Sequence, residues 1–569
     1  MTYKLPKGWI IENLGNIAFI NMGQSPPSSS YNYEQIGLPF YQGKSEFGDI
    51  YPIAEKYCSE PIKIVDYDDV LISVRAPIGP TNLVKDKSCI GRGLAGIKAF
   101  GGMSGKFLLY QLRTKTEELQ EKGTGTTFKS ISKSILEHSI FKIPPLNEQE
   151  RIVSKIESLF SELDQAEKGL EKAKQQLGVY KQALLKSAFE GKLTAEWRKD
   201  NNPESVEMIL EQIENERREH YNQELDDWNA ALLEWHKGNK KGRKPVKPRF
   251  PSFSKARNYK IDKVYGKLPD SWTYTVLSEI SHYITDGDHQ APKKSEVGIP
   301  FITISNIENN IIDFENTFFV SDIYYDSLLD YRKPQKGDVL YTVTGSFGIP
   351  VLVDSGKKFC FQRHIGLIRP VSLTNSAWLF YLMQSKQISD QATISATGTA
   401  QKTVGLNSLR NFVVPFCSYK EQILIVEKLD SQLSIITKYD DVIKTSLLNC
   451  KVIRQSILKK AFEGKLVAQD SLSESANKLL KQIKAEKETY LKKLLDSKKN
   501  APKKIKKMEK SLNIVEVLKS SDQPILAQKV WQESKYNENI TAFYAELKEL
   551  GDKVIETREG LDSFLSLKK

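Results

Sequence analysis

Two long stretches of the chain carry hydrophobic residues at alternating steps of three and four. This spacing is typical of an α-helix with a single apolar stripe, sustained over several heptads. Gln432 and Ser446 interrupt the second stripe. The main stripe positions are Ile152, Ile156, Leu159, Leu163, Leu170, Leu177 and Leu184 in the first stretch and Ile425, Leu429, Ile436, Ile443, Ile453 and Ile457 in the second. Each apolar stripe must be buried against another apolar surface, and the chain contains two such stripes. We therefore predict that the two helices pack together as an antiparallel coiled coil.

Polar residues and glycine mark the expected ends of these helices. Asn147 with Glu150 three residues later forms a capping-box pattern, and Ser418 with Glu421 does the same in the second copy. Gly191 is placed to end the first helix in a left-handed conformation. A helix of about 42 residues is roughly 60 Å long at ~1.5 Å per residue, the scale of one to two turns of B-DNA. We interpret the helices as a spacer between two binding domains; an ordinary helical hairpin core is the alternative.

The helices belong to an internal repeat. Ala188–Leu193 reappears as Ala461–Leu466, and Glu148–Gln149 reappears as Glu421–Gln422; the offset is 273 residues in both cases (461 minus 188, and 421 minus 148). Upstream of each helix the repeat is looser and its offset drifts, so insertions fall in the connecting loops, where binding residues usually lie. The chain therefore contains two similar units.

The units that precede the helices have the pattern of mixed α+β domains. Val70–Val74 and Val339–Val343 are the clearest predicted strands, and turns rich in Gly, Pro, Asn and Ser surround them. The fold class that we predict is α+β, with two homologous mixed α/β domains joined by the long antiparallel helical coiled coil. A small helical C-terminal domain follows.

Seven segments are expected along the chain. They are a first mixed domain at 1–145, a first spacer helix at 146–194, a charged helix with a basic linker at 195–266, a second mixed domain at 267–412, a second spacer helix at 413–467, a second charged helix with a basic linker at 468–511, and the C-terminal domain at 512–569. Tyr490 in the second charged helix either packs in a core or anchors a partner helix.

The C-terminal domain has three helical patterns followed by a short hairpin pattern, which resembles a winged helix. Such a domain binds DNA or docks a protein. Acidic residues such as Glu546 and Glu549 favour a protein partner.

Charge and cysteine usage narrow the class of protein. The net charge of +12 and the pI near 9.0 favour a polyanionic partner. No apolar run approaches the roughly 18 residues that span a bilayer, and the N-terminus lacks a signal-peptide pattern. The five cysteines are scattered and never spaced as C-x-x-C. We therefore expect a reduced, cytoplasmic protein without structural zinc.

Several loops of the mixed domains carry side chains suited to base edges or phosphates. Arginine pairs with guanine, and asparagine or glutamine pairs with adenine, through two hydrogen bonds in the major groove. The candidates are Gln42, Lys44, Arg75, Arg92 and Lys129 in the first domain and His289, Gln290, Asn306, Arg363, His364 and Lys402 in the second. A solvated turn is the alternative for each. Arg92 and Arg363 follow a cysteine at matching places, so phosphate positioning or a structural role suits them better than base reading.

This order of parts resembles the DNA specificity subunit of type I restriction-modification enzymes. The resemblance covers about residues 1–467 and rests on a Pro-containing strand end, a Glu-Gln helix start and an Ala-Phe-x-Gly-x-Leu helix end, each present twice. In the second copy, Phe416–Tyr419 departs from the proline and leucine of the first copy, which changes the turn into the helix.

The resemblance implies a subunit without catalytic residues of its own. Its two domains would be target-recognition domains that read the two halves of a split, asymmetric site in double-stranded DNA. Two modification subunits would dock on the helices, bring S-adenosylmethionine and methylate adenine, and two restriction subunits using ATP and Mg²⁺ would join them. This chain itself is expected to bind no cofactor and no metal.

Two other classes remain as alternatives. A fused restriction-modification enzyme would need catalytic signatures in this chain, but the sequence contains no amino-methylase N-P-P-[YF] motif, no phosphate-binding loop and no H-E-x-x-H. An inert coiled-coil scaffold would show no salt-sensitive DNA binding, whereas a specificity subunit requires it.

Overall fold

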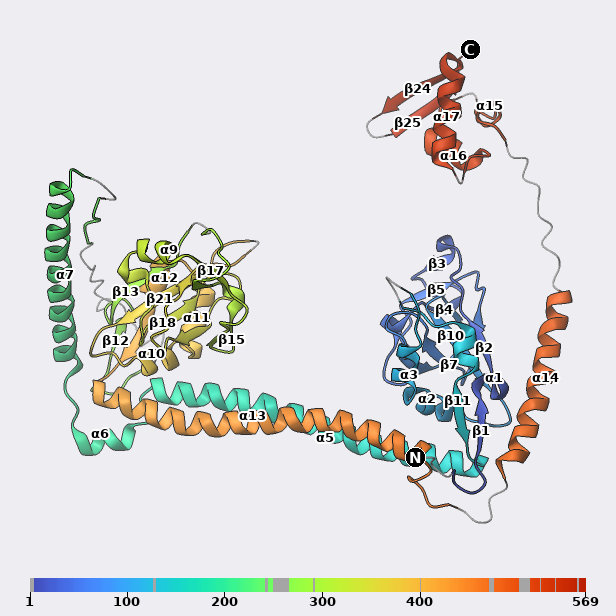
Figure 1. Ribbon diagram of the computed structural model, residues 1–569, viewed down its shortest axis with the longest axis horizontal. Coiled ribbons are helices and arrows are strands. Elements are labelled where there is room, and N and C mark those ends of the chain that lie inside the picture. Colours follow the sequence, from blue (N-terminus) through green and yellow to red (C-terminus); the bar gives the residue numbers. More distant parts are fainter. Residues whose placement is uncertain are drawn as a thin grey trace. The chain divides into compact units, whose positions relative to one another are not determined.

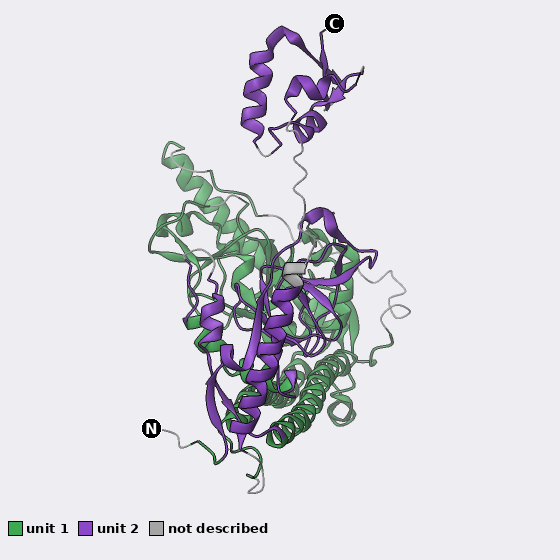
Figure 2. Cartoon of the chain, turned by 90° about the vertical axis from the view of Figure 1, so that its right-hand side faces the viewer, with its two compact units in different colours: residues 1–7, 106–121, 147–473 green, residues 8–105, 122–146, 474–569 purple. Residues whose placement is uncertain are grey.

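The computed structural model describes residues 5–125, 129–240, 244–248, 266–289, 292–399, 401–469, 475–500, 512–521, 523–537, 539–559 and 562–568. Contacts divide the chain into two compact units, coloured separately in Figure 2. The first unit, residues 1–7, 106–121 and 147–473, holds both long helices and the second mixed domain. The second unit, residues 8–105, 122–146 and 474–569, holds the sheets of the first mixed domain and the C-terminal domain.

Three sheets form the first mixed domain. The strand orders are β2-β10-β7-β8, β3-β5-β4-β9-β6 and the pair β1-β11, which joins the two ends of the domain. The strands are β1 (Ile10–Asn13), β2 (Ala18–Met22), β3 (Tyr31–Asn32), β4 (Leu38–Tyr41), β5 (Lys56–Cys58), β6 (Ile64–Val65), β7 (Val70–Ser73), β8 (Thr81–Leu83), β9 (Ser88–Ile90), β10 (Leu94–Ala99) and β11 (Ile140–Ile143). Helices α1 (Leu14–Ile17) and α4 (Lys133–Glu137) complete this part of the domain.

The second mixed domain repeats this architecture (Figure 1). Its four-stranded sheet has the order β13-β21-β18-β19, and β12 pairs with β22 at the ends of the domain. The strands are β12 (Thr273–Val276), β13 (Ser281–Asp286), β14 (Ile299–Ile302), β15 (Ile307–Glu308), β16 (Ile311–Ile312), β17 (Phe318–Val320), β18 (Val339–Thr342), β19 (Pro350–Leu352), β20 (Cys360–Phe361), β21 (Ile365–Pro370) and β22 (Val413–Phe416). The helices are α9 (Asp322–Ser327), α10 (Ser376–Leu382), α11 (Lys386–Ser395) and α12 (Leu406–Arg410).

The two clearest strands of the sequence lie inside their sheets. Every residue of β7 and of β18 is buried. Each of these strands pairs on both sides, with β10 and β8 in the first domain and with β21 and β19 in the second. An unbroken apolar run suits a strand that is covered on both faces, so this prediction is confirmed. Helices α2 (Gly105–Arg113) and α3 (Thr116–Glu121) follow β10 in the sequence.

The two long helices are α5 (Leu146–Phe189) and α13 (Tyr419–Phe462), which lie side by side in Figure 1. They run antiparallel, since Tyr180 near the end of α5 contacts Gln432 near the start of α13, whereas Glu167 contacts Arg454 near the end of α13. The predicted antiparallel coil is confirmed.

The apolar seam differs from the predicted one in part. In α5, Leu159, Leu163, Leu170 and Leu177 are only half-buried. The buried seam positions are Ile152, Ile156 and Leu184 in α5 and Ile425, Leu429, Ile436, Ile443, Cys450 and Ile457 in α13. Ile453 was predicted in the seam but is 45% exposed. In α13, the partly buried position of each heptad lies four residues after the buried one, not three residues after it. Arg454 therefore faces α5 in place of Ile453.

Three of the predicted helix ends are confirmed, and one is wrong. The Ser418 hydroxyl accepts a hydrogen bond from the backbone N–H of Glu421, so Ser418 caps the helix, although the Glu421 carboxylate pairs with Arg198 rather than completing a capping box. Gly191 has φ +74° and Gly464 has φ +69°, the left-handed conformation that glycine adopts without strain. However, α5 begins at Leu146, so Asn147 lies inside the helix and does not cap it.

The repeated Glu-Gln pair is buried at the start of each long helix. The Glu421 carboxylate is fully buried, forms an ion pair with Arg198 of α6 (Ala195–Asn201), and accepts hydrogen bonds from Thr194 (2.6 Å) and Trp272 (2.9 Å). Gln422 accepts a hydrogen bond from the backbone N–H of Asn375 at 2.8 Å. The motif therefore ties the end of α5 and the second mixed domain to the start of α13.

A charged helix packs against each mixed domain. Helix α7 (Val206–Lys237) lies along the second domain in Figure 1, and its Glu216 accepts a hydrogen bond from the backbone N–H of Ser372 at 2.9 Å. Helix α14 (Ala476–Asn500) packs on the first domain. There the ring centroid of Tyr490 lies 5.3 Å from that of Phe19 and 5.5 Å from that of Phe100. Core packing is thus the role of Tyr490.

The C-terminal domain has winged-helix topology. Its element order is α15 (Ile514–Leu518), β23 (Ile525–Leu526), α16 (Ala527–Glu533), α17 (Ile540–Leu550), β24 (Val554–Glu559) and β25 (Asp562–Leu567). The sheet order is β23-β25-β24, so the hairpin packs beside the three helices, as predicted.

None of the described helices is long and apolar enough to cross a membrane. All five cysteines are buried and free. In the described part of the chain, no cluster of three or more His, Cys, Asp or Glu residues is arranged to hold a metal ion.

Candidate nucleic-acid interface

In the first domain, four separate loops meet at one cavity. Ser25 follows β2, Gln42 and Lys44 follow β4, Arg75 follows β7, and Arg92 follows β9. The cavity has a volume of about 250 Å³. Four of the five predicted residues of this domain therefore lie together, although they are far apart in sequence.

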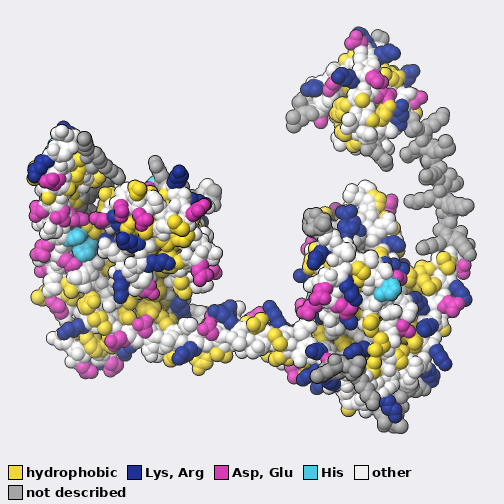
Figure 3. Space-filling model, viewed as in Figure 1, with side chains coloured by type: hydrophobic (Ala, Val, Ile, Leu, Met, Phe, Trp, Pro, Cys, Tyr) yellow, Lys and Arg dark blue, Asp and Glu magenta, His cyan; other side chains and the backbone are white. Residues whose placement is uncertain are grey.

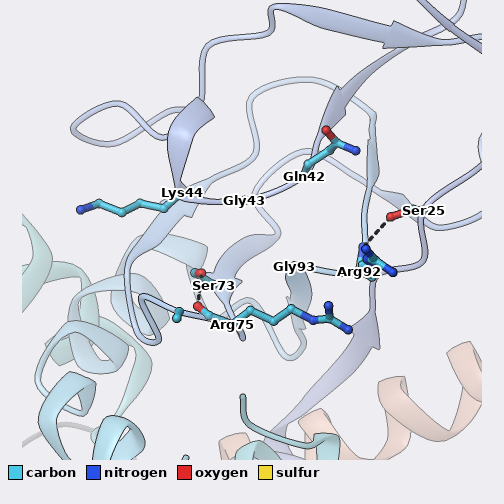
Figure 4. A pocket seen from close by; sticks show the side chains of 9 residues that line it. Ser25, Gln42, Gly43, Lys44, Ser73, Arg75, Arg92 and Gly93 are labelled. Carbon is cyan, nitrogen blue, oxygen red and sulfur yellow. Dashed lines mark hydrogen bonds between the residues drawn. The ribbon is translucent and has the colours of Figure 1, made fainter. Parts of the chain in front are cut away.

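The first cavity is cationic. None of the residues that line it is acidic, and the side chains of Lys44, Arg75 and Arg92 form no ion pair with another described residue. The Ser25 hydroxyl accepts a hydrogen bond from the backbone N–H of Arg92 at 3.3 Å, which holds the arginine loop in place (Figure 4). Lys129 is exposed and precedes Ser130, whose backbone pairs with Arg75. A concentrated positive charge of this kind suits phosphate and the acceptor atoms of bases.

The second domain has a cavity at the matching place, with a volume of about 400 Å³. His289 follows β13, Thr344 follows β18, and Arg363 and His364 follow β20. This cavity also contains an acidic group: the Asp286 carboxylate lies 3.0 Å from His289 Nε2.

Burial lowers the pKa of His364, and the neighbouring Arg363 lowers it further. Arg363 Nε also lies 3.4 Å from His364 Nε2. A neutral imidazole beside a permanent cation both donates and accepts hydrogen bonds, so the second cavity offers a wider range of polar contacts than the first.

The remaining predicted residues are placed differently. Lys402 is exposed and lies next to the second cavity, because Gln401 and Thr403 line it. Asn306 is 4% exposed and closes a turn, where its side chain accepts from the backbone N–H of Thr303 at 2.9 Å and donates to Asn316. Asn306 therefore holds a loop and is not part of the exposed set. Gln290 lies outside the described residues.

Sequence reasoning did not single out Ser25 or Thr344. The repeat contains a weak signal for Ser25, since Gly23 and Gly287 precede matching cavity loops. A Cβ at Gly23 would collide with the backbone of Gly91, and one at Gly287 with that of Phe361. These glycines mark the same close crossing in both domains and locate Ser25 and His289 at matching places.

Charge does not form one uniform patch on these domains. On the face shown in Figure 3, basic and acidic side chains are interspersed over both mixed domains. The cavities are therefore distinguished by the convergence of particular loops rather than by overall charge.

Known proteins resemble the chain in sequence. A family model described as the type I restriction modification DNA specificity domain matches residues 6–174 and 269–445, more than half of the chain. The EcoBI type I restriction enzyme specificity subunit of Escherichia coli is 23% identical over 500 residues, which cover 84% of this chain and 92% of that protein. A protein of Methanocaldococcus jannaschii, provisionally named as the MjaX type I specificity subunit, is 44% identical over 180 residues. Those residues cover 31% of this chain and 42% of that protein, so the likeness spans less than half of the relative.

A solved structure resembles the fold. A chain from a study of complex assembly and conformational transition in the type I R-M system aligns with a TM-score of 0.57 and 18% identity. The alignment covers 81% of this chain and all of that chain. At this identity the likeness concerns the fold alone.

Proposed function

The chain belongs to the type I restriction modification DNA specificity family, and on this premise we propose that its two mixed domains read the two halves of a split DNA target. It acts as a specificity subunit rather than as an enzyme. The observation that carries the proposal is the repeated cavity, which is lined by an arginine on the same loop of both domains, Arg92 in the first and Arg363 in the second. Because the other side chains of the two cavities differ, the two half-sites should differ in sequence.

The binding that we propose combines two kinds of contact. Lysine and arginine side chains contact phosphates and hold each domain in register on the duplex, and polar side chains in the cavities reach base edges in the groove. The net charge of +12 supports such a partner. Binding should therefore weaken steeply as salt concentration rises.

The chain acts with DNA and with other subunits of a type I system. The finer composition that we propose is two modification subunits, which use S-adenosylmethionine to methylate adenine, and two restriction subunits, which use ATP and Mg²⁺. The repeat supports a pair of partners, since the chain contains two similar units, each with its own long helix. We place this assembly in the cytoplasm, where chromosomal and entering DNA are found, and we assign no cofactor to this chain.

The test is to co-express the chain with a modification subunit of the same system and to map N6-methyladenine in the host DNA by long-read sequencing. We expect a split motif that disappears when this chain is deleted. Exchanging residues 1–145 for those of a relative should change one half of the motif and leave the other intact.

Other outcomes would contradict the proposal. Methylation that does not depend on this chain, together with no salt-sensitive DNA binding by the complex, would indicate a scaffold. Methylation by the purified chain alone would indicate a fused enzyme.

A further inference from the structure

The two cavities are built on the same main-chain frame. The backbone N–H of Val74 donates to the carbonyl of Gly93 at 2.9 Å, and that of Val343 donates to the carbonyl of His364 at 2.9 Å. These bonds link equivalent strand ends in the two domains. Gly93 of the first cavity therefore corresponds to His364 of the second.

A second pair of contacts extends this correspondence. The backbone of Arg75 pairs with Ser130 in an isolated antiparallel bridge, and the backbone of Thr344 pairs with Thr403 in the same way. Both residues come two positions after the last residue of their strand, β7 in one domain and β18 in the other. Arg75 and Thr344 thus occupy one structural position in two copies of the fold.

Two cations are the same in both copies. Arg92 and Arg363 each lie one residue before the carbonyl that accepts from the strand end, and both side chains are exposed. Lys129 and Lys402 each precede the residue of the isolated bridge. The phosphate backbone is alike in both halves of any DNA target, so shared cations suit phosphates.

The side chains at the other matching positions differ. Where the first domain has an exposed guanidinium at Arg75, the second has Thr344, which is 8% exposed and accepts a hydrogen bond from the Thr403 hydroxyl at 3.3 Å. Base edges are what distinguishes one half-site from the other. Matching positions with different side chains therefore suit base reading.

The main chain of Arg75 is held while its side chain is free. The Ser73 hydroxyl donates to the Arg75 carbonyl at 3.1 Å, and the bridge to Ser130 fixes the other side of the residue. The guanidinium forms no ion pair with a described residue. In Figure 4 it extends toward the same side as Arg92, whereas Lys44 extends the opposite way. An arginine that reads a base needs a fixed backbone and a planar guanidinium that can donate two parallel hydrogen bonds to the base.

We propose that Arg75 is a specificity-determining residue of the first half-site and pairs with the O6 and N7 atoms of one guanine. This inference rests on the proposed function of the cavity. The same structural position holds arginine in the first domain and threonine in the second. Only the first half-site should therefore require a guanine there.

The test compares variants of the full chain in the methylating complex, with motifs mapped by long-read sequencing and affinity measured on DNA carrying each base at each position. Arg75→Thr introduces the side chain of the second domain. We expect discrimination at one guanine position of one half-site to fall about tenfold to a hundredfold, the effect of losing one bidentate pair. The other half-site should remain unchanged.

Three further variants make the result specific. Arg75→Lys keeps the charge without the fork, so affinity should hold while discrimination falls. Arg92→Ala should weaken binding to all sequences without changing the motif and should reduce the salt dependence by about one phosphate contact. Lys85→Thr removes an exposed charge outside the cavity and should leave the motif intact.

An unchanged guanine requirement in Arg75→Thr, or a uniform loss of affinity like that of Arg92→Ala, would overturn the inference. If Arg75→Thr failed to fold, Arg75→Lys would carry the same test. Failure of the proposed function would look different, because exchange of residues 1–145 would then alter neither half of the motif.

Discussion

At the scale of single residues, Glu421 is a buried side chain with three polar partners. Its carboxylate is fully buried, and the Arg198 side chain that pairs with it is only 13% exposed. Removal of one partner of a buried pair leaves an uncompensated charge in a medium that solvates it poorly. The junction between α6 and α13 therefore depends on both residues.

We predict that Glu421→Ala lowers the free energy of unfolding by about 3 kcal/mol or more, a typical cost of breaking a buried pair. Urea unfolding followed by circular dichroism measures this. Glu196→Ala is the matched control, because Glu196 is exposed and its ion pair is with the exposed Lys199, and it should change stability by less than about 0.5 kcal/mol. A Glu421→Ala unfolding midpoint equal to that of the wild type would contradict the assignment.

A second residue-scale feature is pH dependence where α7 meets β13. Burial lowers the pKa of His282, and the nearby His220 lowers it further, although Glu216 at 3.0 Å acts in the opposite direction. The folded state thus holds this histidine neutral more firmly than the unfolded state, whose histidine has a pKa of about 6.5. The contribution of the neutral His282 to the free energy of unfolding is fully present above about pH 6.5 and declines as the pH falls below that value.

We predict that the attachment of α7 weakens on acidification below about pH 6.5. Hydrogen exchange of the α7 and β13 amides as a function of pH measures the effect, and His282→Asn should flatten the profile. His138→Gln, which alters an exposed histidine, should leave it unchanged. Protection that stays constant from pH 7.5 to pH 5 in the wild type would exclude this role, both pH values being about one unit or more from the ordinary pKa.

At the scale of elements, the seven-residue repeat of buried positions constrains the length of the coiled coil. Helices α5 and α13 each have 44 residues, and the buried positions of α13 from Leu429 to Ile457 recur every seven residues. An insertion of seven residues keeps the seam in register, whereas an insertion of four rotates it.

We predict that seven residues inserted at the middle of both helices lengthen the gap between the two half-motifs by about 3 base pairs. Seven residues add about 10.5 Å at ~1.5 Å per residue, and a base pair rises ~3.4 Å. Methylation mapping reads the gap directly, with both half-motifs expected to stay the same. A gap of unchanged length would mean that the coil is not the spacer.

At the scale of the whole molecule, the charge of the C-terminal domain differs from that of the rest of the chain. Residues 512–569 contain eight Lys and Arg against ten Asp and Glu, a net charge of −2, whereas the whole chain carries +12. In its winged-helix fold, α17 exposes Ile540 and Tyr544 and carries Glu546 and Glu549. An acidic and apolar helix is poorly suited to DNA phosphates.

We predict that deletion of residues 512–569 leaves the methylated motif unchanged and alters DNA affinity by less than twofold. Motif mapping and titration of labelled DNA check this. A matched variant, Lys548→Glu, reverses the one basic side chain of α17 and should also leave affinity unchanged. A loss of affinity in both variants would assign the domain to DNA binding instead.

Much of this architecture was predictable because it follows from local patterns. The long helices follow from a hydrophobic period near 3.6, their ends from glycine, which adopts the left-handed conformation without strain, and the central strands from short unbroken apolar runs. The duplication made the antiparallel pairing predictable too, because each apolar stripe requires a mate. Where the prediction failed, at the helix start beside Asn147 and at Ile453, the local pattern allowed two registers and the packing partner selected one.

The sequence by itself determined that two similar units are present, the long helices and central strands of those units, and the repeated motifs. Only the tertiary structure decided which polar residues act together, since Gln42, Arg75 and Arg92 come from loops that meet through sheet pairing between distant strands. It also separated Asn306, which closes a buried turn, from exposed candidates of similar chemistry. The physical reason is that burial and convergence depend on long-range contacts, which leave no periodic trace along the chain.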